Sequence, residues 1–144
     1  SCVRARSRWS LMPATVVDRS PALDRSSALL VCAAAWLLPG LGHLLLKRTQ
    51  KGLVFLVVVP AMFALGLVLQ GRIFPFEWAQ PLVALAAFAD VGIGLPYFLA
   101  WMLGAGAGTV VTPTYEYGNT FLIVAGLLNM LTVLDAFDIS AGRK

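Results

Sequence analysis

The chain has 144 residues, of which 59% are hydrophobic and only 12% are charged, and its mean hydropathy is +0.82. Soluble domains are typically about half apolar and about one quarter charged, so this chain has too few polar side chains to cover a soluble globule. The net charge of +4 comes from basic residues that flank apolar runs, a pattern typical of membrane proteins. Composition therefore predicts one integral membrane domain that contacts lipids and does not bind nucleic acid.

Residues 1–25 form a basic, polar N-terminal tail interrupted by Pro13 and Pro21. A cleaved signal peptide would place a short apolar core directly before a small-residue cleavage site. Here the first apolar run leads into a Pro-Gly pair and a histidine instead. We therefore expect the tail to be retained, with Ser1 following removal of an initiator methionine.

Four apolar runs follow the tail within a membrane domain at residues 26–134. Because about 20 apolar residues span the hydrocarbon core of a bilayer, we expect four transmembrane helices, at residues 28–46, 52–69, 82–104 and 120–134. Residues 135–144 form a polar C-terminal tail. The runs lack the alternation of barrel strands, so the predicted fold class is an all-α integral membrane protein.

Helix-breaking residues interrupt the first and third runs. Pro39 and Gly40 lie two-thirds of the way along the first run, where proline removes a backbone donor. Either this run crosses the membrane with a kink, or residues 28–38 enter part-way and the chain returns to the same face. We favour the kinked span. The third run is broken by glycine and proline between residues 90 and 96.

One turn between apolar runs has the sequence Pro39-Gly40-Leu41-Gly42-His43, and Lys51-Gly52 opens the next run. This pattern resembles the signature hairpin of TM2-like bacterial membrane proteins, although Leu44-Leu45-Leu46 stands where an aromatic residue and a glycine are common. The stretches 115–118, 125–129 and 134–139 are similar to one uncharacterised branch of these small proteins. The resemblance implies a multi-pass bacterial membrane protein and supplies no catalytic residue.

Lys and Arg residues favour the face that holds the N-terminus by eight to three, whether the first run spans or returns. Because cytoplasmic loops carry an excess of these residues, we expect a cytoplasmic N-terminus in the bacterial cytoplasmic membrane.

His43 is the only histidine of the chain. A single imidazole cannot supply bis-histidine haem ligation or a histidine metal cage. One interpretation is an interfacial histidine that bonds backbone groups left unpaired at Pro39 and Gly40. The other is the axial ligand of one chlorophyll-type pigment, for which Gly40 and Gly42 would leave room.

Asp90 interrupts the third apolar run, and a carboxylate within a membrane span marks a functional site by default. Structural interpretations are an N-cap of the following half-helix or a pair with Asn129 or Thr132. The functional interpretations are a proton or ion site and a contact with a partner subunit. Asp135 and Asp138 follow the last run, and we expect them to face water or a partner.

No acid/base pair, catalytic triad or phosphate loop can be assembled from these residues, so we expect a protein that is not an enzyme, and lipid-metabolising activity is the least favoured hypothesis. The first hypothesis is a non-catalytic accessory subunit of a larger membrane complex, most concretely a photosynthetic reaction-centre or respiratory assembly that binds a pigment or lipids. The alternative is a small transporter or channel-like oligomer that uses Asp90.

Overall fold

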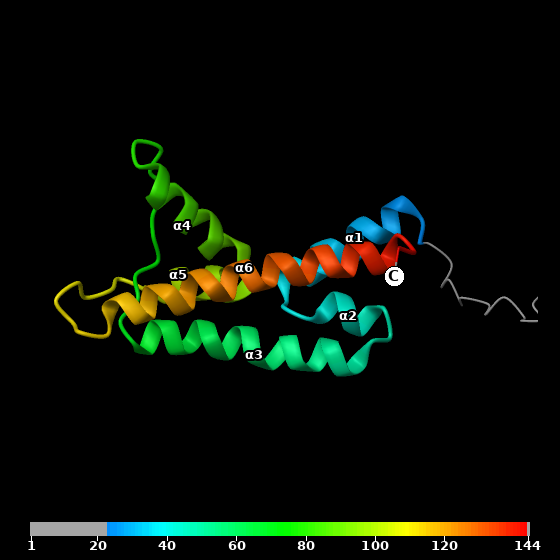
Figure 1. The fold of residues 1–144 in the computed structure, drawn as a ribbon, viewed down its shortest axis with the longest axis horizontal. Helices are drawn as coiled ribbons and strands as arrows, with labels where there is room; N and C mark the ends of the chain where they lie inside the picture. The colour runs from blue at the N-terminus through cyan, green and yellow to red at the C-terminus, as the bar shows by residue number, and fades with distance from the viewer. Residues whose placement is uncertain (1–22, 144) are drawn as a thin grey trace, which may run out of the picture.

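The computed structural model describes residues 23–143, which fold into helices, loops and one isolated β-bridge (Figure 1). The helices of this range are α1 (Arg25–Leu37), α2 (Leu41–Leu45), α3 (Thr49–Val68), α4 (Pro81–Gly92), α5 (Leu95–Met102) and α6 (Tyr115–Ser140). The long helices α3 and α6 pack antiparallel, and both are long and apolar enough to cross a membrane. The predicted all-helical membrane class therefore agrees with the structure.

The helices α1 and α2 form a hairpin that enters the bundle and returns to the same end (Figure 1). With 13 residues, α1 is about 20 Å long at ~1.5 Å per residue, which is less than the roughly 30 Å of the hydrocarbon core. Gly42 of α2 lies against Ala35, and Leu46 packs beside Val31, so the chain runs back along α1. The structure thus shows the returning geometry and not the kinked span that we favoured for residues 28–46.

Gly40 makes this reversal possible. Its φ angle of 86° lies in the left-handed region, which glycine adopts without steric cost. A methyl group at this position would also overlap the carbonyl oxygen of Gly52 on α3. The Pro-Gly pair therefore ends α1 and brings the tip of the hairpin close to the next helix, instead of kinking a continuous helix.

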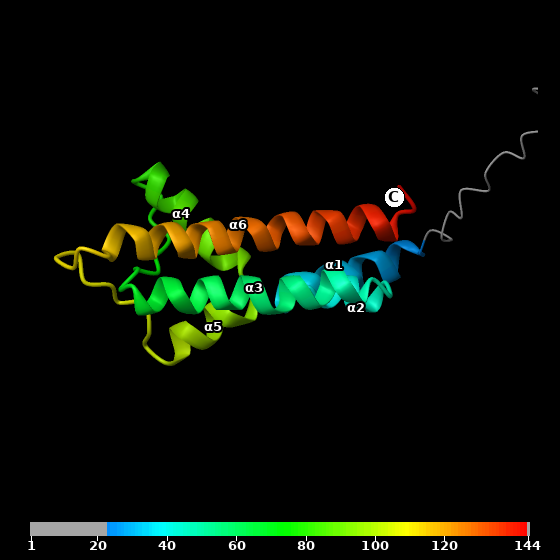
Figure 2. The same ribbon diagram turned by 60° about the horizontal axis from the view of Figure 1, so that its bottom comes forward.

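The helices α4 and α5 form a second hairpin, which enters from the opposite end. They are bent by 105° at their break, where the glycines and proline between residues 90 and 96 predicted an interruption. Residues 82–104 therefore do not form the single transmembrane helix that we predicted, and the described chain has two or three helical spans instead of four. After α5 the chain returns to the end of the bundle where α3 stops, because Ile73 donates a backbone hydrogen bond of 2.9 Å to Gly106. Figure 2 shows α4 and α5 on opposite sides of the α3–α6 pair.

The chain therefore contains two successive units of similar design, and the second runs in the opposite direction. Each unit is a half-length hairpin followed by a long helix (Figures 1 and 2). The long helices also share a motif in register: Gly52 and Gly118 are each the fourth residue of their helix, and Phe-Leu-x-Val begins three positions later in both. The sequence thus carries a trace of the repeat.

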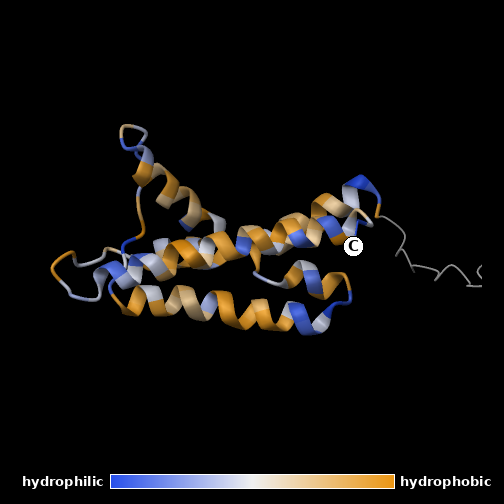
Figure 3. Cartoon of the chain, in the orientation of Figure 1, coloured by the Kyte–Doolittle hydropathy of each residue, from blue (hydrophilic) through white to orange (hydrophobic). Residues whose placement is uncertain are grey.

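Hydrophobic residues predominate along the middle of the long helices, and hydrophilic residues are more frequent toward the ends of the molecule (Figure 3). Many large apolar side chains are exposed, as suits a surface that faces lipid. The buried interior contains many small residues, which let helix backbones approach closely in membranes. These include Ala28, Ala35, Ala87, Ala89, Ala100, Ala125 and Ala136.

We predict that Gly94→Ala destabilises the fold far more than Gly104→Ala. Both glycines have positive φ angles, 81° and 66°, and a left-handed L residue costs about 1–2 kcal/mol. A methyl group at Gly94 would also overlap the carbonyl oxygen of Trp36, whereas nothing lies within 4 Å of one at Gly104. Thermal unfolding of the purified protein in detergent measures both losses. Equal losses would contradict the close contact between the hairpin tips.

Candidate functional site

The tips of the two hairpins meet beside the middle of α6. Trp36, near the end of α1, donates a hydrogen bond from Nε1 to the carbonyl oxygen of Val91 at 3.2 Å. Its ring packs edge-to-face on Phe98 of α5, with the ring centroids 6.2 Å apart. Non-helical backbone is tolerated within a membrane where protein buries it, and both breaks are buried, at Pro39, Gly40, Gly92, Ile93 and Gly94.

Asn129 of α6 connects both tips through one amide group. Its side chain is fully buried, and Nδ2 donates to the carbonyl oxygens of Trp36 at 3.0 Å, Gly92 at 2.9 Å and Ile93 at 3.2 Å. The last carbonyls of a helix have no partner within that helix, so Asn129 satisfies helix ends from both hairpins. An amide carries two N–H donors, and at least one is therefore shared between two carbonyls.

Asp90 is also fully buried, near the tip of the second hairpin. Its Oδ2 atom accepts a hydrogen bond of 3.0 Å from the backbone N–H of Phe74, and Oδ1 has no hydrogen-bond partner among the described residues. The structural partners that we predicted are not used. Asn129 bonds backbone carbonyls instead, and Thr132 donates to the carbonyl of Leu128 on its own helix at 2.9 Å.

A cleft of about 350 Å³ lies between the N-terminal halves of α4 and α6. Its apolar wall includes Leu82, Val83, Ala86 and Ile123, and polar side chains of α6 line the remainder, namely Tyr115, Glu116, Asn119 and Thr120. Phe74 also lines the cleft, and its backbone N–H donates the hydrogen bond that Asp90 accepts. The cleft therefore reaches the loop residue that contacts Asp90, although Asp90 itself does not line it.

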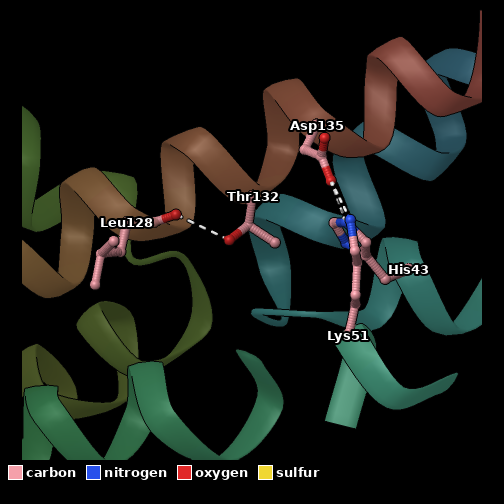
Figure 4. A network of polar contacts seen from close by, with 5 residues as sticks. All are labelled: His43, Lys51, Leu128, Thr132 and Asp135. Atoms are coloured by element: carbon pink, nitrogen blue, oxygen red, sulfur yellow. Dashed lines mark hydrogen bonds and ion pairs between the residues drawn. The ribbon is translucent and has the colours of Figure 1, made fainter. Parts of the chain in front are cut away.

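His43 belongs to a second polar cluster, at the opposite end of the bundle (Figure 4). It is fully buried, and its Nε2 atom lies 3.0 Å from Oδ2 of Asp135. The Nζ atom of Lys51 is 3.8 Å from the same oxygen, and the ring of Phe55 lies 5.4 Å from the imidazole. The cluster links α2 and the start of α3 to the C-terminal part of α6.

This cluster corrects two predictions. The partner of His43 is a side chain and not the backbone at Pro39 and Gly40, and Asp135 lies in a helix that continues through Ser140 instead of a polar tail. Sequence reasoning missed the pair because 92 positions separate its members.

The surroundings of His43 do not fit a chlorophyll-type pigment. An axial ligand needs a ring nitrogen that faces a space large enough for a macrocycle. Here the imidazole has no exposed surface, and Nε2 is engaged by Asp135. Gly40 and Gly42 are packed against Gly52 and Ala35, so the space that these glycines were expected to leave for a macrocycle is occupied by protein. No group of three or more potential metal-ligating side chains occurs in the described part of the chain either.

We predict that Asn129→Asp destabilises the protein strongly, whereas Asn119→Asp has little effect. The structure uses the N–H donors of Asn129, which aspartate lacks, so three carbonyls would face a carboxyl group. At Asn119 it uses the oxygen instead, which accepts the backbone N–H of Arg72 at 2.7 Å, and aspartate keeps that acceptor. Thermal unfolding and tryptophan fluorescence compare the two variants. Similar losses from both would contradict the role of Asn129.

Comparison with known proteins identifies one matching protein family. Neither a curated protein nor a solved structure matches the chain, and the resemblance to TM2-like proteins stays a prediction. A family model matches residues 30–144, a range that includes both hairpin tips and both long helices. The chain therefore belongs to the family of unknown function DUF6677.

Proposed function

We propose that this protein is a small transporter or channel-like oligomer in which two half-membrane hairpins meet at mid-depth. The observation that carries the proposal is the contact of two broken hairpins, which belong to units of opposite direction, beside Asn129. Many secondary transporters are built from inverted repeats, and discontinuous helices form their substrate sites near the bilayer midplane. In this arrangement α3 and α6 cross the membrane, and the hairpins enter from opposite faces.

The distribution of charge supports one orientation of this topology. Of the six described Lys and Arg residues, Arg72 lies at the end where α3 stops and α6 begins. The other five lie at the opposite end, namely Arg25, Lys47, Arg48, Lys51 and Arg143. This asymmetry is stronger than the eight to three counted from the sequence. By the positive-inside rule, the first hairpin enters from the cytoplasm of a bacterial cell and the second from the outer face.

Asp90 is the transport site of this proposal, with a proton as the transported species. A carboxylate can take up and release a proton, and acidic residues within membrane spans commonly act as proton relays. Oδ1 of Asp90 is the available atom, because Oδ2 accepts the Phe74 N–H. In this proposal a proton reaches Asp90 from the outer face past Phe74, which lines the cleft between α4 and α6, and the exposed Glu116 carboxylate at the cleft attracts cations.

An accessory subunit of a larger membrane complex, photosynthetic or respiratory, is the second candidate. It is favoured by apolar side chains exposed beyond the helices, of which Val111 is 92% exposed and Leu103 81% exposed. Exposed apolar side chains that gather in a patch mark interaction sites. This candidate predicts that the protein extracted in mild detergent migrates with subunits that carry cytochromes or chlorophyll. A lone, colourless oligomer would contradict it.

We predict that Asp90→Asn abolishes proton flux while leaving the fold intact. The asparagine oxygen can still accept the Phe74 N–H, but the amide cannot exchange a proton. Flux is measured in proteoliposomes under an imposed pH gradient, with a fluorescent dye inside. Asp138→Asn is the matched control, since this half-buried carboxylate lies at the C-terminal end of α6, far from Asp90, and pairs with Arg143. Wild-type flux no greater than that of empty liposomes, or unchanged flux in Asp90→Asn, would contradict the proposal.

A further inference from the structure

We propose that the turn between α2 and α3 binds the headgroup of an anionic phospholipid. This basic turn, residues 47–51, lines a cavity of about 440 Å³. It contains Lys47, Arg48 and Lys51, and all five of its residues are exposed. The proposal does not depend on proton transport, because the turn and Asp90 belong to different units of the fold.

The positive charge of the basic turn is largely unneutralised. Lys47 and Arg48 form no ion pair within the described range. Lys51 reaches Asp135 only at 3.8 Å, and the same oxygen lies 3.0 Å from His43. No acidic residue occupies the first turn of α3. Cations at the N-terminal, positive end of a helix are unfavourable, so a bound phosphate would relieve this repulsion.

The neighbouring surface favours a lipid phosphate over free phosphate. Exposed aliphatic side chains adjoin the turn on α2 and follow it on α3: Leu45 is 57% exposed, Leu53 59%, Val54 57% and Val57 59%. Cationic groups at a membrane interface next to an apolar helix face match the two ends of a phospholipid. A headgroup at the turn therefore leaves its acyl chains beside these residues.

Arg143 and Arg72, at other places in the described chain, do not combine several unneutralised positive charges with a neighbouring aliphatic surface. Arg143 pairs with Asp138 at 3.4 Å and lies over the ring of Phe137. Arg72 is a single basic residue at the opposite end of the molecule. These two arginines supply a matched control, because replacing both removes the same charge as replacing Lys47 and Arg48.

A lipid at the basic turn would also stabilise the first hairpin. The turn joins α2 to α3, and Lys51 belongs to the His43–Asp135 cluster that links both helices to α6 (Figure 4). Binding of a ligand to the folded state raises its stability by an amount that grows with the logarithm of ligand concentration relative to Kd. We therefore expect anionic lipid to raise the unfolding temperature of the full chain in detergent.

Native mass spectrometry of the full chain tests the proposal, with phosphatidylglycerol and phosphatidylcholine of identical acyl chains as probes. We expect preferential binding of one phosphatidylglycerol and a loss of that preference by about tenfold or more in Lys47→Gln/Arg48→Gln, since each basic contact near anionic lipid contributes substantially. Arg72→Gln/Arg143→Gln keeps the preference. Unfolding in phosphatidylcholine alone verifies that both variants fold equally well.

Three results would overturn the proposal. Equal binding of the two lipids excludes headgroup recognition. An equal loss of the preference for phosphatidylglycerol in both double variants shows that only the net charge of the protein matters. Inorganic phosphate that raises the unfolding temperature as much as phosphatidylglycerol shows a site for free anions. Lipid selectivity with no measurable proton flux would leave this inference standing and remove the proposed function.

Discussion

The fold depends on the need of buried backbone carbonyls for hydrogen-bond donors. In the proposed topology each hairpin tip ends one helix within the membrane, where water cannot satisfy the freed carbonyl groups. The amide of Asn129 supplies donors to both tips. These hydrogen bonds require the helix backbones to approach closely, which glycine permits. A methyl group at Gly126 would overlap the carbonyl of Ala89, and a methyl group at Gly94 would overlap the carbonyl of Trp36.

Helix α6 is the element on which the polar contacts of the membrane domain converge. Asn119 receives the backbone N–H of Arg72 after α3, Asn129 holds both hairpin tips, and Asp135 contacts His43 and Lys51. The three side chains lie near the beginning, middle and end of one helix. Each contacts a different segment, so α6 holds both hairpins in place relative to the long helices. Asp90 lies outside this set, on α4, and its Oδ1 atom has no hydrogen-bond partner among the described residues, as is also true of Oδ1 of Asn129 and Nδ1 of His43.

Composition and helix breakers in the sequence were enough to predict the all-helical membrane class and both interruptions. The return of the first hairpin could not be decided, because counting Lys and Arg gives the same ratio for a spanning and a returning segment. The hydrogen-bond partners of Asn129 and His43 could not be predicted from the sequence either. Trp36 is 93 positions from Asn129, and Asp135 is 92 positions from His43. The repeat was readable from Gly52 and Gly118, had the two long runs been aligned from their first residues.

The topology is tested most directly by the accessibility of single cysteines in intact cells, in a chain whose Cys2 and Cys32 are replaced by serine. Cysteines at Ser26 and Gln50 flank the first hairpin, and cysteines at Ala79 and Val111 flank the second. Two returning hairpins predict that a membrane-impermeant maleimide labels the second pair from outside and the first pair only after the membrane is permeabilised. A different sidedness within either pair would show that the hairpin between them crosses the membrane, and would contradict this account.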